Sequence, residues 1–277
     1  MRTVLISIAA AAAVAQLTAC VRAEAGTDTP PAQVRVTAMN YAFRAPDTVE
    51  AGLVRLRMDN AGTELHHTQF IRLDSGKTFE DLARTMQGPW RPMPAWARHV
   101  GGPGAVIPGD SSEVVMPLTP GNYALVCYVP DEQGRPHFSL GMMRPLVVVA
   151  AGVPAANPPV ADVVMVLDDY RFDLSAALRR GRQTIEVTNA ASQFHEVVFM
   201  KMEPGKTAMD FARWEMGRQG PPPGRPIGGP VGLDRGERNW FTVDLEPGNY
   251  SLICFYPDRR DGQPHFAHGM TRDFVIE

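Results

Sequence analysis

The chain has 277 residues, of which 44% are hydrophobic and 21% charged, and its formal net charge is -3. This balance is typical of a folded globular protein, and the length suits two domains of ordinary size. Lys and Arg are scattered and form no basic stripe, which argues against nucleic acid as a partner.

The N-terminal segment indicates export. Residues 1–19 carry one basic residue followed by an apolar run, which predicts a signal peptide. Leu17-Thr18-Ala19-Cys20 resembles the lipobox of bacterial lipoproteins, in which the cysteine becomes the acylated first residue. Cleavage after Ala23-Glu24-Ala25 is the alternative. Both interpretations predict a protein of the bacterial cell envelope or periplasm, and the lipobox predicts a lipid anchor on Cys20 as its membrane attachment.

Beyond residue 33 the sequence contains one unit twice. Several stretches return at a nearly constant offset: NYAF (Asn40–Phe43) as DYRF (Asp169–Phe172), and PGNYALVC (Pro120–Cys127) as PGNYSLIC (Pro247–Cys254). We therefore predict two copies of one domain, at residues 34–150 and 160–277. Residues 20–33 and 151–159 are the predicted linkers, the second rich in Pro and Ala.

Each copy is predicted to consist of strands with one short helix. Val54, Leu56 and Met58 alternate with polar residues, as in a strand with one buried face. A helix is expected after each GKT stretch, where Thr78 with Asp81 and Thr207 with Asp210 form approximate capping boxes. Many short strands with one helical insertion predict an all-β chain of two tandem Greek-key β-sandwiches.

Potential metal ligands recur at matching places in both copies. One strand is predicted to start at the first histidine, and the chain then reverses direction at the PGNY turn. The next strand returns toward the starting pole of the sandwich and ends at the cysteine. The first histidine and the cysteine should therefore meet at the same pole. The loop after the cysteine starts there and carries a second histidine and a methionine. The candidate ligand sets are His66, Cys127, His137 and Met142, and His195, Cys254, His265 and Met270.

The donor types favour copper. A thiolate and two imidazoles with a weak thioether form a type 1, or blue, copper site. Zinc is the main competitor, although methionine is a poor zinc ligand. A disulfide between Cys127 and Cys254 is a further alternative, because an oxidising compartment favours paired cysteines. Such a bridge would have to join equivalent positions of two separate domains.

These residues resemble the cupredoxin family, which includes plastocyanin and azurin. The family pattern is Asn-x-Gly before a histidine, then PGxY before the cysteine and a Cys…His…Met loop. Asn60-Ala61-Gly62 matches it, whereas the second copy has Asn189-Ala190-Ala191. The spacing from cysteine to histidine is longer than in plastocyanin and is more similar to copper nitrite reductases. The resemblance implies one type 1 copper per domain.

The remaining histidines were considered for a second, catalytic copper. His67 has Glu196 as its counterpart and is predicted to face outward, while His99 and His268 are predicted on the solvated surface. Copper enzymes of this family carry a histidine directly before the cysteine, where this chain has Val126 and Ile253. The sequence therefore predicts a protein that is not an enzyme.

The predicted function is single-electron transfer in the cell envelope, with a small redox protein as partner. Two alternatives stay open. A copper carrier or storage protein would use the same ligands with easier ligand exchange. A pair of metal-free cupredoxin-like domains would serve as a binding or structural module.

Overall fold

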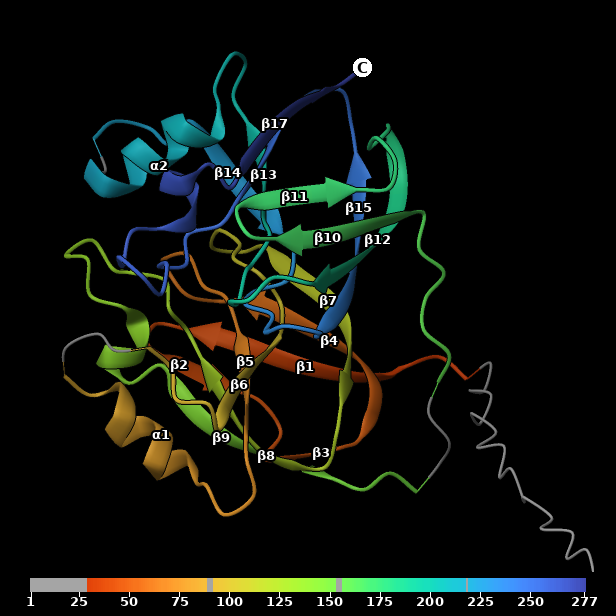
Figure 1. Cartoon of the computed structure of the whole chain (residues 1–277), viewed down its shortest axis with the longest axis vertical. Coiled ribbons are helices and arrows are strands. Elements are labelled where there is room, and N and C mark those ends of the chain that lie inside the picture. Colours follow the sequence, from red (N-terminus) through yellow and green to blue (C-terminus); the bar gives the residue numbers. More distant parts are fainter. Residues whose placement is uncertain (1–28, 89–91, 153–155, 218) are drawn as a thin grey trace, which may run out of the picture.

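The computed structural model describes residues 29–88, 92–152, 156–217 and 219–277. The predicted signal peptide 1–19, Cys20 and most of the linker 20–33 lie outside the described residues, as do three residues of the linker 151–159. No helix in the described part of the chain is long and apolar enough to cross a membrane. The prediction of an all-β chain with two helices is confirmed (Figure 1).

The first half holds nine strands, one α-helix and one short 3-10 helix. They are β1 (Ala32–Met39), β2 (Ala42–Arg44), β3 (Thr48–Glu50), β4 (Gly52–Asn60), β5 (Gln69–Leu73), α1 (Phe79–Met86), β6 (Ala97–Gly101), β7 (Ser111–Leu118), β8 (Gly121–Val126), η1 (His137–Leu140) and β9 (Met143–Val149).

The second half repeats this order with eight strands. They and their helices are β10 (Val163–Asp168), β11 (Arg171–Leu174), β12 (Gly181–Asn189), β13 (Val198–Met202), α2 (Ala208–Gly217), β14 (Gly224–Gly228), β15 (Arg238–Leu245), β16 (Gly248–Ile253), η2 (His265–His268) and β17 (Thr271–Ile276).

Each half is a two-layer sandwich. One layer of the first half is the sheet β3-β9-β8-β5-β6, and one layer of the second is β14-β13-β16-β17. The chain crosses from β4 to β5 in the other sheet and returns from β6 to β7. Val54, Leu56 and Met58 are at most 1% exposed, as the alternation in β4 predicted, because successive side chains of a strand face opposite sides.

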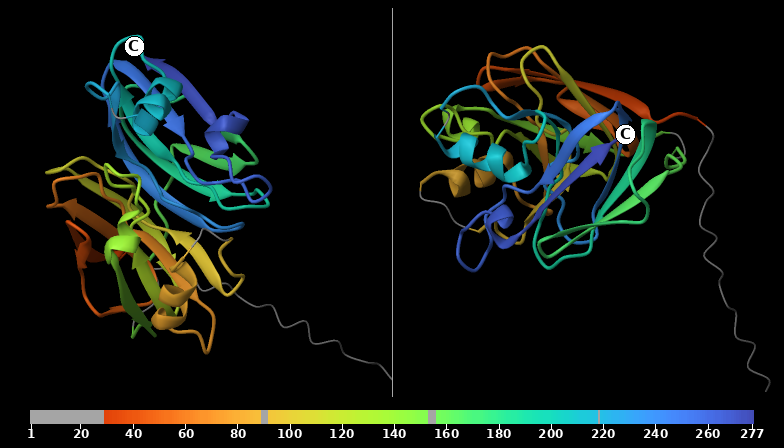
Figure 2. Two further views of the ribbon diagram at one scale, coloured as in Figure 1. Left: turned by 90° about the vertical axis from the view of Figure 1, so that its left-hand side faces the viewer. Right: turned by 90° about the horizontal axis from the view of Figure 1, so that it is seen from above.

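The two halves share their remaining layer. It is one sheet of eight strands in the order β11-β10-β12-β15-β7-β4-β1-β2, and β15 pairs with β7 at Trp240 and Val115. Figure 2 shows the halves stacked directly on each other. The sequence predicted two sandwiches but not this continuous sheet, because the pairing of distant strands leaves no local pattern.

Buried polar contacts reinforce the junction between the halves. Asn239 is fully buried, and its amide donates to the carbonyl of Val100 at 3.1 Å and accepts from the N–H of Gly102 at 3.1 Å. Gln69 donates to the carbonyl of Gly232 at 2.9 Å and accepts from the hydroxyl of Tyr256 at 2.9 Å. These side chains thus join backbone groups of one half to side chains of the other and satisfy their own buried polar atoms.

Both predicted helices begin with the expected caps. Thr78 Oγ1 accepts from the N–H of Asp81 at 3.2 Å, and the Asp81 carboxylate accepts from the N–H of Thr78 at 3.0 Å. Thr207 and Asp210 repeat this exchange at the second helix. The reciprocal bonds satisfy free N–H groups at each helix start.

Candidate metal centres

A buried asparagine positions the first histidine of each set. Asn60 donates to the carbonyls of Glu64 and Val106, and its oxygen accepts from the N–H of Gly62 at 2.9 Å. His66 then pairs with Val106 in an isolated bridge. Asn189 makes the matching bonds before His195.

The predicted strand starts need a small correction. His66 and His195 were expected to begin strands, but β5 begins at Gln69 and β13 at Val198. The histidines lie in the irregular segments before these strands, where single bridges hold them instead of a ladder.

The structure brings three predicted ligands together in each half. In the first, His66 Nδ1 lies 3.1 Å from His137 Nδ1, and Cys127 Sγ lies 3.9 Å and 3.5 Å from these two nitrogens. In the second, the corresponding distances are 2.9, 3.9 and 3.3 Å among His195, Cys254 and His265. All six side chains are fully buried.

The donor triangles fit a metal ion. Three atoms spaced in this way leave a point about 2 Å from each, which is close to the length of metal–imidazole and metal–thiolate bonds. The geometry and the soft sulfur donor together fit copper.

Each predicted methionine lies beside its cysteine. The N–H of Cys127 donates to the carbonyl of Met142 at 3.2 Å, and the N–H of Cys254 to that of Met270 at 3.3 Å. Both methionine side chains are fully buried. The structure therefore places the backbone of Met142 and of Met270 beside the cysteine of its half, and their role as ligands stays a prediction.

Burial disfavours the charged form of both cysteines and of several imidazoles. It raises the pKa of Cys127 to about 12 and that of Cys254 well above its usual value. Burial and the neighbouring ring lower the pKa of His66 to about 4, and that of His265 to about 4. A metal must therefore displace the thiol proton when it binds, whereas His66 and His265 are already in their neutral, ligating form.

Carboxylates behind the imidazoles were not predicted, and they differ between the halves. Glu64 Oε2 lies 2.7 Å from His137 Nε2. In the second half the carboxylate is Asp169, 3.4 Å from Nε2 of His195. Such partners orient a ligating imidazole and raise its basicity. The sequence contained one indication of this difference, because Gln193 stands in the second copy where the first has Glu64.

The interpretation of His67 as outward-facing is wrong. Its side chain is 5% exposed, and its Nε2 accepts from the N–H of Tyr128 at 2.8 Å. Glu196, its counterpart, is also 5% exposed and accepts from the N–H of Phe255 at 3.0 Å. Each side chain therefore holds the backbone of the residue that follows the cysteine.

The placement of His99 on the surface is also wrong. The residue is 1% exposed, its Nε2 lies 3.1 Å from the hydroxyl of Tyr128, and its ring stacks on Phe194 at 4.4 Å between centroids. His268 does lie near the surface, 3.2 Å from Asp261.

Cys127 and Cys254 are both free thiols. Each belongs to the donor group of its own half, with His66 and His137 or with His195 and His265. The alternative disulfide between Cys127 and Cys254 is therefore not formed in this structure.

The chain is similar to several solved copper proteins at low sequence identity. Neither a protein-family model nor a curated protein matches the chain. Among solved structures, the reduced auracyanin of Roseiflexus castenholzii is 20% identical, with 44% of this chain and 99% of that chain covered and a TM-score of 0.31. A multicopper oxidase is 13% identical, with 88% of each chain covered and a TM-score of 0.27.

A copper-containing nitrite reductase from Thermus scotoductus is 15% identical, with 90% of this chain and 68% of that chain covered and a TM-score of 0.25. Each half of this chain has two β layers and a buried His–Cys–His group at one pole. Each half thus has a cupredoxin-like fold. The prediction made from the Asn, PGNY and Cys…His…Met patterns is confirmed at this level.

The prediction that this cupredoxin-like chain is not an enzyme is wrong. The similar structures include two copper enzymes that match about nine-tenths of the chain. The sequence argument also assigned the spare histidines to the surface, whereas His67 and His99 are buried between the halves. That part of the argument therefore fails, although Val126 and Ile253 still precede the cysteines.

Proposed function

We propose that the chain is an exported protein with one type 1 copper in each half, which exchanges single electrons in the cell envelope. The observation that carries this proposal is the pair of fully buried His–Cys–His triangles with a buried methionine beside each cysteine. Copper bound there supplies a one-electron couple. The chain supplies a frame that holds the donors nearly fixed, which favours fast exchange between two oxidation states.

Burial of the donors favours electron transfer over copper delivery. A carrier must release its metal through ligand exchange with a partner, and that requires an approach to the donor atoms. All three donors of both groups are 0% exposed. Electrons, unlike ions, can pass through the packed residues around the sites.

The proposed setting follows from the N-terminal sequence. A lipid anchor at Cys20 would hold the chain at a membrane surface, and a small redox protein is the proposed partner. Stopped-flow mixing of the reduced protein with an oxidised small redox protein tests the proposal. We expect fast one-electron oxidation of both sites. Slow oxidation together with rapid transfer of copper to a chelator would support the carrier instead.

The carboxylate behind His137 gives a site-specific prediction. Glu64→Gln removes a negative charge 2.7 Å from the imidazole and so destabilises the oxidised, more positive metal. We expect the reduction potential of the first-half site to rise by roughly 60 mV, which corresponds to about 1.4 kcal/mol for one electron. Spectroelectrochemical titration measures both sites.

The control for this prediction is Glu50→Gln, the same change at an exposed position of the first half. It should leave both potentials unchanged. An equal rise at both sites in Glu64→Gln, or no rise at either, would contradict the assigned role of Glu64.

A further inference from the structure

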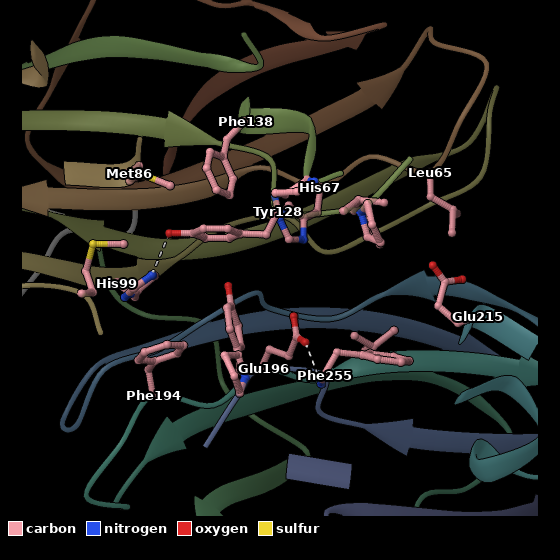
Figure 3. Close-up of a pocket in the computed structure, with 18 of the residues that line it drawn as sticks. Leu65, His67, Met86, His99, Tyr128, Phe138, Phe194, Glu196, Glu215 and Phe255 are labelled. Atoms are coloured by element: carbon pink, nitrogen blue, oxygen red, sulfur yellow. Dashed lines mark hydrogen bonds between the residues drawn. The ribbon is translucent and has the colours of Figure 1, made fainter. Parts of the chain in front are cut away.

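A cavity of about 610 Å³ lies between the two halves. Figure 3 shows one wall built by the first half, with His67, His99 and Tyr128, and the facing wall built by the second, with Glu196 and Phe255. This volume is in the range of sites that hold small organic molecules.

The cavity adjoins both candidate metal centres. Tyr128 directly follows Cys127, and Phe255 directly follows Cys254. Phe194 and Glu196 stand on either side of His195 in the sequence and also line the space. A molecule bound there would contact residues that are covalently joined to donors of both groups.

Aromatic rings from both halves shape the cavity. Tyr128 lies 5.9 Å from Tyr256 and 5.6 Å from Phe138 between ring centroids, both edge to face. Phe194 contacts Tyr256 in the same manner at 4.6 Å. Aromatic rings from both halves thus line the cavity, which favours a planar aromatic guest over a flexible aliphatic one.

One buried acidic group is directed at this space. Glu196 is 5% exposed, and one of its oxygens accepts the N–H of Phe255. Its other oxygen has no hydrogen-bond partner among the described residues, and Figure 3 shows the carboxyl group between the two walls. A buried acceptor of this kind favours a ligand that brings a donor to it.

We propose that this cavity binds a planar aromatic molecule whose hydroxyl or amino group donates a hydrogen bond to Glu196. The rings of both walls stack against the guest, and the free carboxyl oxygen fixes its orientation. Binding needs neither copper nor electron transfer, so this site is independent of the function proposed above.

A matched pair of probes tests the donor requirement. Equilibrium dialysis with the copper-loaded protein compares 2-naphthol with 2-methoxynaphthalene, which has the same rings but no donor. We expect 2-naphthol to bind roughly three- to tenfold more tightly, the range for one ordinary hydrogen bond. The amine 2-aminonaphthalene then distinguishes an amino from a hydroxyl ligand. Equal binding of the first two probes would overturn the proposal.

Glu196→Gln tests the residue. The amide oxygen can still accept the N–H of Phe255, but an N–H₂ donor then faces the ligand. We expect 2-naphthol to lose most of its advantage over its methyl ether. Glu203→Gln, the same change at an exposed site of the second half, should preserve it.

A second variant tests whether the ligand binds in this cavity. Val198 lines the cavity, and Val198→Phe fills part of it, so both naphthalenes should lose binding. Unchanged binding in Val198→Phe would place the ligand elsewhere, and an unchanged preference in Glu196→Gln would remove Glu196 from the site.

Discussion

Replacement of Cys127 by Ser is expected to remove the copper of the first half and about half of the blue absorption. A serine hydroxyl does not ionise near neutral pH, so the site loses the thiolate whose charge transfer gives the colour. Cys254 belongs to a separate donor group with His195 and His265, and distant sites behave additively. Metal analysis and the visible spectrum measure the effect.

Cys254→Ser is the matched variant and should remove the other half. The double variant should be colourless and bind little copper. A loss of all colour from either single change would mean one site shared between the halves, which the two separate triangles do not predict.

The second large effect concerns the junction between the halves. Asn239→Leu removes both side-chain bonds to Val100 and Gly102 and leaves their buried backbone groups unpaired. We expect the free energy of unfolding to fall by roughly 3–5 kcal/mol. For a chain of this size that corresponds to a fall in Tm of about 10 °C.

The control is Asn122→Leu, the same change at an exposed position whose amide donates to the carbonyl of Lys77 at 3.3 Å. It should change stability by less than about 0.5 kcal/mol. Calorimetry compares the two variants. Equal values of Tm would show that the halves do not depend on this contact.

Repetition made the donor groups predictable. Residues of the same type stand at matching places in both copies, and the direction of the strand that ends at the cysteine fixes which pole the cysteine reaches. The same comparison failed for His67 and Glu196 because the two side chains differ in chemistry. Both side chains nevertheless have the same structural role, because each accepts a hydrogen bond from the N–H of the residue after the cysteine. Any buried acceptor at this position can fill that role.

Contacts between the copies could not be inferred from either copy alone. The pairing of β7 with β15, the burial of Asn239 and the placement of His99 beside Phe194 join positions more than 90 residues apart in the sequence. The secondary-structure propensity of a short segment does not depend on such distant partners, so it cannot predict them. The cavity lined by both halves was unpredicted for the same reason.

The most direct test of the central claim is the copper content of the purified, oxidised chain measured together with its visible spectrum. Two buried triangles, each with a thiol and two imidazoles, predict about two copper ions per chain and an intense blue absorption that disappears on reduction. A colourless protein that binds no copper, or one that holds zinc in both sites, would contradict the account.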